Sequence, residues 1–331
     1  MSPVHAYVPS VIFILILILL VLFCVFLSLP FSFVSCFEAP KRKSTLSQNP
    51  LRSEGSSSSD TTPSHVRFHY DKARKDFLEN FSWWGIHSEC QVILLNFFDT
   101  NLPTVIYSQG WESLCGISVT CPSMIIQEFY SNTHGIDTSV PHFVTHIRGT
   151  CIVVTPNIVS EVLHVPRVAQ PNYPLCDRLR TMSKDELSSL FCETPSSWGD
   201  RQNTPCSGFA KGSRFLNMVM TLILHPLSQY NSITEPCAQF LLSLLEDISI
   251  DFPSHFILSL IDLYRDTTTR DKLIFLSAIM RLLCHFSISY PESPYFMVIN
   301  TIDAATVRRS EAQIRLRRPR TEIVTLKVIM A

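Results

Sequence analysis

One uncharged apolar segment near the N-terminus constrains this chain more than any other feature. The segment Val8–Pro30 reads VPSVIFILILILLVLFCVFLSLP and carries no charged side chain. About 20 apolar residues in a helix span roughly 30 Å, which is the thickness of the hydrocarbon core of a bilayer. Side chains of this type favour membrane insertion by about 0.3–0.6 kcal/mol each. The sequence therefore predicts one transmembrane helix over about residues 8–30, within a hydrophobic N-terminal segment of residues 1–37.

Two other interpretations of this segment stay open. A secretory signal peptide has a basic start and a shorter apolar stretch, whereas only His5 precedes this long run. The second interpretation is that the segment is translated from non-coding DNA and belongs to no working protein. If it spans a membrane, Lys41, Arg42 and Lys43 on its C-terminal side stay cytoplasmic. We then expect a single-pass membrane protein with its large domain in the cytosol.

Residues 38–65, between the apolar segment and the next apolar residues with helical spacing, have the composition of a disordered linker. A basic triplet is followed by a run rich in Ser, Thr and Pro, which cannot bury enough apolar surface to fold. The whole chain has 331 residues and a formal net charge of −1, which gives no global electrostatic argument for nucleic-acid binding. Its 11 cysteines have no regular close spacing and predict reduced, mostly buried thiols.

Residues 66–302 have the apolar periodicity of a packed core and predict a mainly α, multi-helix globular domain. Two short β-rich runs, Val144–Ile147 and Cys151–Val154, flank Arg148-Gly149-Thr150 and predict one small β-hairpin. Capping residues and prolines mark helix starts, as in the capping box that begins at Ser183. Helices are expected over Tyr70–Trp84, Pro122–Asn132, Pro156–Val162, Phe215–Leu224, Pro253–Tyr264 and Asp271–His285, with further helices after Ser183 and Thr234.

The C-terminal residues 303–331 are basic and predict a disordered tail. Arginine recurs between Arg308 and Arg320, with few acidic residues. Clustered arginine side chains neutralise phosphates, so nucleic acid is one expected partner of this stretch. The stretch lacks interleaved aromatic residues for base stacking, which favours a solvated tail or an anionic lipid surface.

Short motifs in the folded region follow the order of a known family. The motif residues are Trp111, Glu128, Phe129, Tyr130, Asn132, Arg148, Gly149, Pro166, Trp198, His225 and Pro226. In order and spacing they resemble the plant transposon protein domain family, over roughly residues 71–288. The resemblance implies an origin in a plant mobile element, and it implies no reaction and no catalytic residue. The chain departs from the family pattern in its apolar leader and at Cys237, near which the family commonly has a basic residue.

The sequence predicts no catalytic residue and no cofactor. A two-metal nuclease site needs carboxylates at a selective spacing, which is absent among Asp99, Glu112, Glu128, Asp137, Glu161 and Glu246. With nine glycines, the chain has no glycine-rich phosphate-binding motif. No sequence pattern brings together a nucleophile and a base from Cys115, Cys192, Cys206 and His225.

Four residues around the predicted hairpin come nearer to a metal-site pattern. His142 and His146 are four residues apart, with His134 and Cys151 nearby. Zinc requires four nitrogen or sulfur ligands that converge on one point. The residues between His142 and His146 favour a strand, however, where positions i and i+4 lie too far apart to bind one ion. The sequence therefore predicts structural histidines and no metal site.

A separate hypothesis is that the side chains of Glu128 and Arg148 form an ion pair. A buried pair between them would favour one register of the Glu128 helix against the hairpin.

Together these features predict a non-enzymatic, single-pass membrane protein that carries a transposon-derived binding or scaffold domain. Its expected partners are the lipid bilayer through Val8–Pro30, and nucleic acid or anionic lipid through Arg308–Arg320. The alternative is a nuclear, nucleic-acid-associated mobile-element protein with a mispredicted N-terminus. A divergent metal-dependent nuclease is the third and weakest hypothesis.

Overall fold

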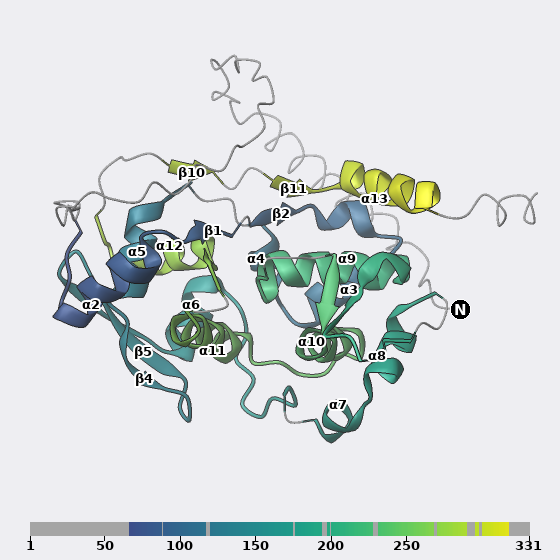
Figure 1. Ribbon diagram of the computed structural model, residues 1–331, viewed down its shortest axis with the longest axis horizontal. Coiled ribbons are helices and arrows are strands. Elements are labelled where there is room, and N and C mark those ends of the chain that lie inside the picture. Colours follow the sequence, from purple (N-terminus) through teal and green to yellow (C-terminus); the bar gives the residue numbers. More distant parts are fainter. Residues whose placement is uncertain are drawn as a thin grey trace, which may run out of the picture. The chain divides into compact units, whose positions relative to one another are not determined.

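The computed structural model places every described residue in one compact unit, Asp60–Ala331 (Figure 1). The described residues are 66–87, 89–116, 120–174, 176–193, 197–198, 200–227, 231–267, 270–289, 295–297 and 300–317. The predicted transmembrane helix (residues 8–30) and the predicted linker (residues 38–65) lie outside these ranges. Within the ranges, no helix combines the length and the apolar character needed to cross a membrane.

Roughly half of the described residues are helical, and several small sheets accompany the helices. The prediction of a mainly helical domain with one hairpin is therefore confirmed in its helices and incomplete in its strands. Most of the additional strands are two or three residues long and pair with distant segments. These pairs are β1 (Gly85–Ile86) with β9 (Lys272–Leu273), β2 (Cys90–Val92) with β11 (Asn300–Ile302), β3 (Thr120–Pro122) with β10 (Tyr295–Met297), and β7 (Asn203–Pro205) with β8 (Ser232–Thr234).

The predicted hairpin is present and belongs to a three-stranded antiparallel sheet. Strand β5 (His142–Ile147) lies between β4 (His134–Asp137) and β6 (Thr150–Val154). The two loop residues have positive φ angles, 53° at Arg148 and 84° at Gly149. Such a loop matches the right-handed twist of the strands that it joins. The turn therefore fixes the register Ile147 opposite Thr150.

Most predicted helices form, with shifted ends. They are α2 (Asp71–Asp76) with the π-helical η1 (Phe77–Phe81), α5 (Ser123–Ser131), α6 (Pro156–Leu163), α8 (Lys184–Phe191), α9 (Lys211–Val219) with η4 (Met220–Leu224), α10 (Glu235–Leu245), α11 (Phe252–Arg265) and α12 (Leu276–His285). Short helices that were not predicted are η2 (Leu94–Phe97), α3 (Leu102–Ser108), α4 (Glu112–Cys115), α7 (Asp177–Thr181) and η3 (Cys206–Gly208). The capping box of α8 is confirmed, because Ser183 and Glu186 satisfy each other's backbone N–H.

Two helix starts differ from prediction for identifiable reasons. The helix predicted from Asp271 begins at Leu276, because Lys272 and Leu273 pair with β1 instead. Thr234 stands at the N-cap of α10, yet its hydroxyl donates to Cys237 Sγ at 3.0 Å rather than capping the helix.

The predicted disordered tail is wrong over its first half, which forms α13 (Ala304–Arg317). Asp303 precedes this helix, and its Oδ1 accepts the backbone N–H of Thr306 at 2.9 Å. Val307 packs against the hydrophobic core, and Glu311 lies 3.1 Å from Lys211 Nζ of α9. The hydrogen bond from Thr306 to Asp303 caps the helix, and the contacts of Val307 and Glu311 attach it to the domain. The basic composition of the stretch gave no indication of these contacts.

Helix α5 occupies a central place in the packing. Its side chains Ile125, Ile126 and Phe129 are buried in the hydrophobic core. The helix contacts η1, β3 and β5, so that it joins the N-terminal helices to the sheet (Figure 1). The end of α5 leads directly into β4, and this junction positions the site described next.

Candidate metal centre

The three-stranded sheet has one buried face and one outer face. Phe143 and Ile147 of β5 point to the core, so His146 between them in the alternation points outward. The register places His134 of β4 opposite Val144, two residues before His146. Because residues two apart on a strand share a face, His134 and His146 are neighbours on the outer face.

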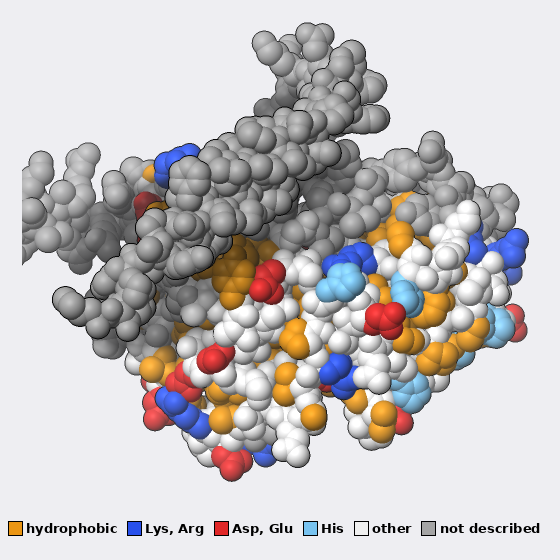
Figure 2. Space-filling view, turned by 180° about the vertical axis from the view of Figure 1, so that it is seen from behind, with side chains coloured by type: hydrophobic (Ala, Val, Ile, Leu, Met, Phe, Trp, Pro, Cys, Tyr) orange, Lys and Arg blue, Asp and Glu red, His pale blue; other side chains and the backbone are white. Residues whose placement is uncertain are grey.

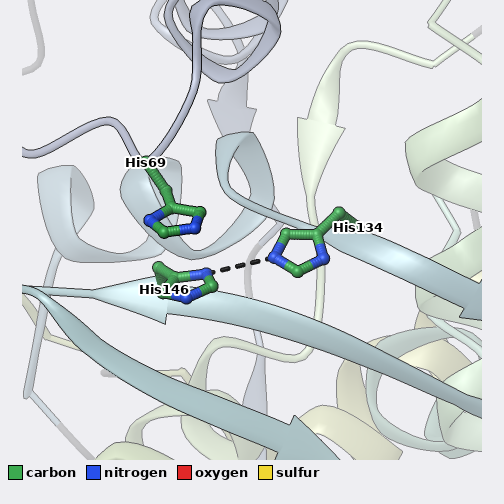
Figure 3. A group of neighbouring side chains, drawn as sticks. All are labelled: His69, His134 and His146. Carbon is green, nitrogen blue, oxygen red and sulfur yellow. Dashed lines mark hydrogen bonds between the residues drawn. The ribbon is translucent and has the colours of Figure 1, made fainter.

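Three imidazoles converge on this face (Figure 3). One ligand nitrogen from each of His69, His134 and His146 lies within 4.8 Å of the other two. His134 Nε2 is 3.1 Å from His146 Nδ1. The ring of His69 stacks on that of His146, with centroids 3.6 Å apart and planes 6° from parallel. Among the described residues this is the only group of three or more potential metal ligands that lie so close together.

The backbone of His69 is held in place by the end of α5. Asn132 Oδ1 accepts the His69 N–H at 2.9 Å, and Asn132 Nδ2 donates to the carbonyl of Arg67 at 2.8 Å. The next residue, Tyr70, donates its hydroxyl to the carbonyl of Thr133 at 2.8 Å. These three bonds fix the segment that carries His69 beside the start of β4.

The hairpin that carries His146 is held by the same helix. Glu128 is fully buried, and its Oε1 accepts the backbone N–H of Arg148 at 2.8 Å. The Arg148 guanidinium lies 3.3 Å from Glu128 Oε2, so the hypothesised pair exists and is buried. Burial raises the pKa of the Glu128 carboxyl, while Arg148 and Arg67 act in the opposite direction. The pair stabilises Arg148 in its left-handed conformation and fixes the hairpin against α5.

The electrostatics of the cluster favour neutral imidazoles. Burial lowers the pKa of His134, and the nearby His69 lowers it further. Burial also lowers the pKa of His146, and the nearby His69 and His134 lower it further. A neutral imidazole is the form that binds a metal ion, so protons compete weakly for these nitrogens.

The geometry fits a zinc-type ion after one adjustment. Two nitrogens that bind one tetrahedral zinc at about 2.0–2.1 Å lie roughly 3.3 Å apart, which is close to the His134–His146 separation. The lone pairs of two parallel stacked rings cannot both point at one ion. The His69 ring must therefore rotate off His146, and its exposed position leaves room for that rotation.

The sequence identified part of this cluster. His142 and His146 do lie on a strand, as predicted, and His142 bonds to Val140 rather than to the cluster. Sequence reasoning missed His69, which is 65 residues before His134. Hydrogen bonds of segment 66–70 to Asn132 and Thr133 bring His69 there, and no local pattern in the sequence encodes those contacts.

The other residues that the sequence analysis considered do not assemble into a site. His225 Nδ1 lies 3.3 Å from His255 Nε2 in an aromatic cluster with Phe240. Cys206 accepts a hydrogen bond from Asn217, and Asp99 pairs with Lys211. These contacts contribute to the packing of the domain, and none of them forms a site.

A small cavity beside a buried carboxyl group lies elsewhere in the core. Glu89 accepts the Ser277 backbone N–H at 3.0 Å, and its other oxygen has no hydrogen-bond partner among the described residues. The adjoining cavity of about 20 Å³ is lined mostly by apolar side chains, including Phe252 and Phe275. That volume holds about one water molecule and is too small for a substrate.

Comparison with known protein families assigns the chain to one of them. The model described as "Putative plant retrotransposon-related domain" matches residues 107–289, more than half of the 331 residues. The chain belongs to this family. The resemblance inferred from the motif residues is thereby confirmed. No curated protein and no solved structure matches the chain.

Four of the motif residues of this retrotransposon-related domain lie in the elements that carry or support the histidine cluster. Glu128, Asn132, Arg148 and Gly149 hold the segment and the hairpin that carry the cluster. The others serve packing: Phe129, Tyr130, Trp111, Trp198 and Pro226 are buried, His225 is half-buried, and Pro166 is exposed beside Gly110.

Proposed function

We propose that this retrotransposon-related protein is a non-catalytic binding protein in which one zinc-type ion is held by His69, His134 and His146. The observation that supports the proposal is the convergence of three imidazole nitrogens within 4.8 Å of one another. His69 precedes the matched family region, so the ion joins segment 66–70, which leads into that region, to the three-stranded sheet. Its role is to complete and rigidify the folded module that presents a binding surface.

The energetic effect of such an ion is substantial. An ion that binds the native state alone, at a free concentration 100 times its Kd, adds about 2.7 kcal/mol to the free energy of unfolding. That is a large part of the 5–15 kcal/mol that is typical of a folded domain. The ion also replaces the stacked His69–His146 contact by two metal–nitrogen bonds.

The state of the thiols supports a non-catalytic role. Burial raises the pKa of Cys115 and of Cys206 to about 12, and it raises the pKa of Cys121 further. A nucleophilic cysteine requires a lowered pKa and access to solvent. These three thiols therefore act as small apolar side chains in the core.

Zinc titration of the full chain, purified in detergent, tests the proposal. We expect one zinc ion per chain, and an affinity that falls by roughly 100-fold or more in each of His69→Ala, His134→Ala and His146→Ala, because loss of outer-shell contacts alone costs about 10–100-fold. His142→Ala is the matched control, since His142 lies on the same strand outside the cluster, and should bind as the unmodified chain does. Equal affinity in all five proteins would refute the site.

A second candidate function is contact with nucleic acid or anionic lipid through the basic C-terminal helix. Arg308 and Arg309, two adjacent basic residues of α13, are both exposed. On the face of the molecule shown in Figure 2, by contrast, acidic and basic side chains are mixed. Positive charge on one helix favours phosphate contact with counterion release. Retention on DNA, RNA or anionic vesicles that weakens with salt, and that weakens further in Arg308→Glu/Arg309→Glu, is the expected result.

We further propose that Val8–Pro30 anchors the chain in a membrane with the domain in the cytosol. The support is the length and apolar character of that segment and the basic residues that follow it. A tagged full-length chain should stay with membranes in alkaline carbonate. Release into the supernatant would favour the nuclear alternative.

A further inference from the structure

Cys151 lies on the same face of the sheet as the histidine cluster. In the pairing of β5 with β6, His146 is directly opposite Cys151. Directly opposed residues of an antiparallel pair project to the same side, with Cβ atoms about 4.5–5.5 Å apart. The burial pattern agrees, because Ile152 and Val154 of β6 are buried while Cys151 is exposed. Cys151 is thus the immediate cross-strand neighbour of a cluster histidine.

Three imidazoles leave one position of a tetrahedral ion unfilled. Structural zinc sites are almost always closed by four protein ligands, drawn from histidine and cysteine. In the described conformation the Cys151 sulfur is not among the atoms of the close group. Rotation about χ1 of an exposed cysteine between its staggered positions costs little and moves the sulfur by about 3 Å.

Resting on the proposed function, we propose that Cys151 is the fourth ligand, so that the ion is bound by three histidines and one cysteine. On binding, the Cys151 sulfur loses its proton to solvent and forms the metal–sulfur bond, while a water leaves the ion. No electron is transferred in this step. The site then ties together three separate elements, namely segment 66–70, β4 and the β5–β6 hairpin.

Other described residues are less suited to this role. His142 lies four residues from His146 on the same strand, about 13 Å along it at 3.3–3.4 Å per residue, and bonds to Val140. Cys284, the other exposed cysteine among the described residues, lies in the last turn of α12, outside the sheet. Water is the remaining possibility, and a water ligand would leave the ion open as in catalytic sites.

Cobalt substitution distinguishes a thiolate from water. Co²⁺ in a tetrahedral site gives visible d–d bands, and a cysteine ligand adds a thiolate-to-cobalt charge-transfer band in the near ultraviolet. The full chain, Cys151→Ser and Cys284→Ser are each titrated with Co²⁺ and then with competing Zn²⁺. Cys284→Ser controls for the loss of any exposed thiol.

We expect the charge-transfer band in the unmodified chain and in Cys284→Ser, and its loss in Cys151→Ser. The d–d bands should persist in Cys151→Ser, because three histidines remain, and its zinc affinity should fall by about 10–100-fold or more. Visible bands without a charge-transfer band in the unmodified chain would overturn the Cys151 assignment while leaving the histidine site in place. A charge-transfer band that survives in Cys151→Ser would overturn it equally. Absence of all cobalt bands would instead refute the proposed function itself.

Discussion

Glu128 is the residue whose loss should most disturb the surroundings of the cluster. Its side chain is fully buried against Arg148, which is 17% exposed. Removal of one partner from a buried pair leaves the other charge uncompensated and costs about 3–5 kcal/mol. We therefore expect Glu128→Ala to lower the free energy of unfolding in urea by about 3 kcal/mol, and Glu128→Ala/Arg148→Met to recover part of that loss.

An exposed pair on α2 and η1 provides the control for Glu128. The Lys75–Glu79 pair is at least 60% exposed on both sides at 3.9 Å, and Glu79→Ala should cost less than about 1 kcal/mol. Equal losses for Glu79→Ala and Glu128→Ala would show that the buried pair has no special role.

Asn132 should affect metal binding without itself touching the ion. Its amide holds the backbone of Arg67 and His69, so Asn132→Ala frees the segment that delivers one ligand. Changes of this kind typically reduce metal affinity by about 10–100-fold. Zinc competition assays on Asn132→Ala should show such a decrease while the stoichiometry stays at one. An unchanged affinity would mean that His69 is not a ligand, or that it is positioned by other contacts.

Among the elements, the hairpin turn makes the clearest prediction. Gly149 has φ of +84°, and a Cβ there would meet Arg67 Nη1, the nearest atom beyond the adjoining residues, at an ordinary 3.4 Å. The cost of Gly149→Ala is therefore conformational, about 1–2 kcal/mol for an L-residue in this region. Gly116 has negative φ and open space around it, so Gly116→Ala should be neutral or stabilise by up to about 1 kcal/mol. Urea denaturation compares the two variants, and the opposite ranking would contradict the turn geometry.

The contact between η4 and α11 should make the domain sensitive to acid. Burial lowers the pKa of His225 to about 4 and that of His255 to about 3, from an ordinary 6.5. Below pH 6.5 the unfolded chain therefore binds protons that the folded chain does not. The free energy of unfolding should fall on acidification towards pH 4, by up to about 1.4 kcal/mol per pH unit for each histidine.

Replacement of one histidine tests this acid sensitivity. His255→Phe keeps an aromatic ring against Phe240, whose centroid is 4.7 Å away, and removes one titrating group. The slope of stability against pH should decrease by about 1.4 kcal/mol per pH unit. Part of the slope should remain, because burial also lowers the pKa of His87 to about 4. An unchanged slope would show that His255 does not titrate on unfolding.

For the whole molecule, local signals predicted local structure well. The two β-rich runs around Arg148-Gly149 predicted the hairpin, and Pro156 and the capping box at Ser183 predicted the starts of α6 and α8. The same signals failed wherever distant segments pair. Strand β9 shortened a predicted helix because β1 lies beside it, and α13 formed in a stretch whose composition indicated disorder.

The candidate site follows the same rule. His134, His146 and Cys151 lie within one local sheet, and the sequence placed them near one another. His69 joins them through hydrogen bonds to Asn132, across more than 60 residues. Such a contact depends on tertiary packing of α5, which no periodicity in segment 66–70 encodes. The sequence predicted no metal site, because His142 and His146 lie too far apart on a strand and because nothing in the sequence pointed to His69.

The most direct test of the metal centre is an anomalous diffraction measurement at the zinc absorption edge, on crystals of the zinc-loaded protein. We predict one strong anomalous peak between the rings of His69, His134 and His146, with metal–nitrogen distances of about 2.0–2.1 Å. The His69 ring should have rotated off its 3.6 Å stack on His146. A zinc-loaded crystal with the stack intact and no peak at this position would contradict the account.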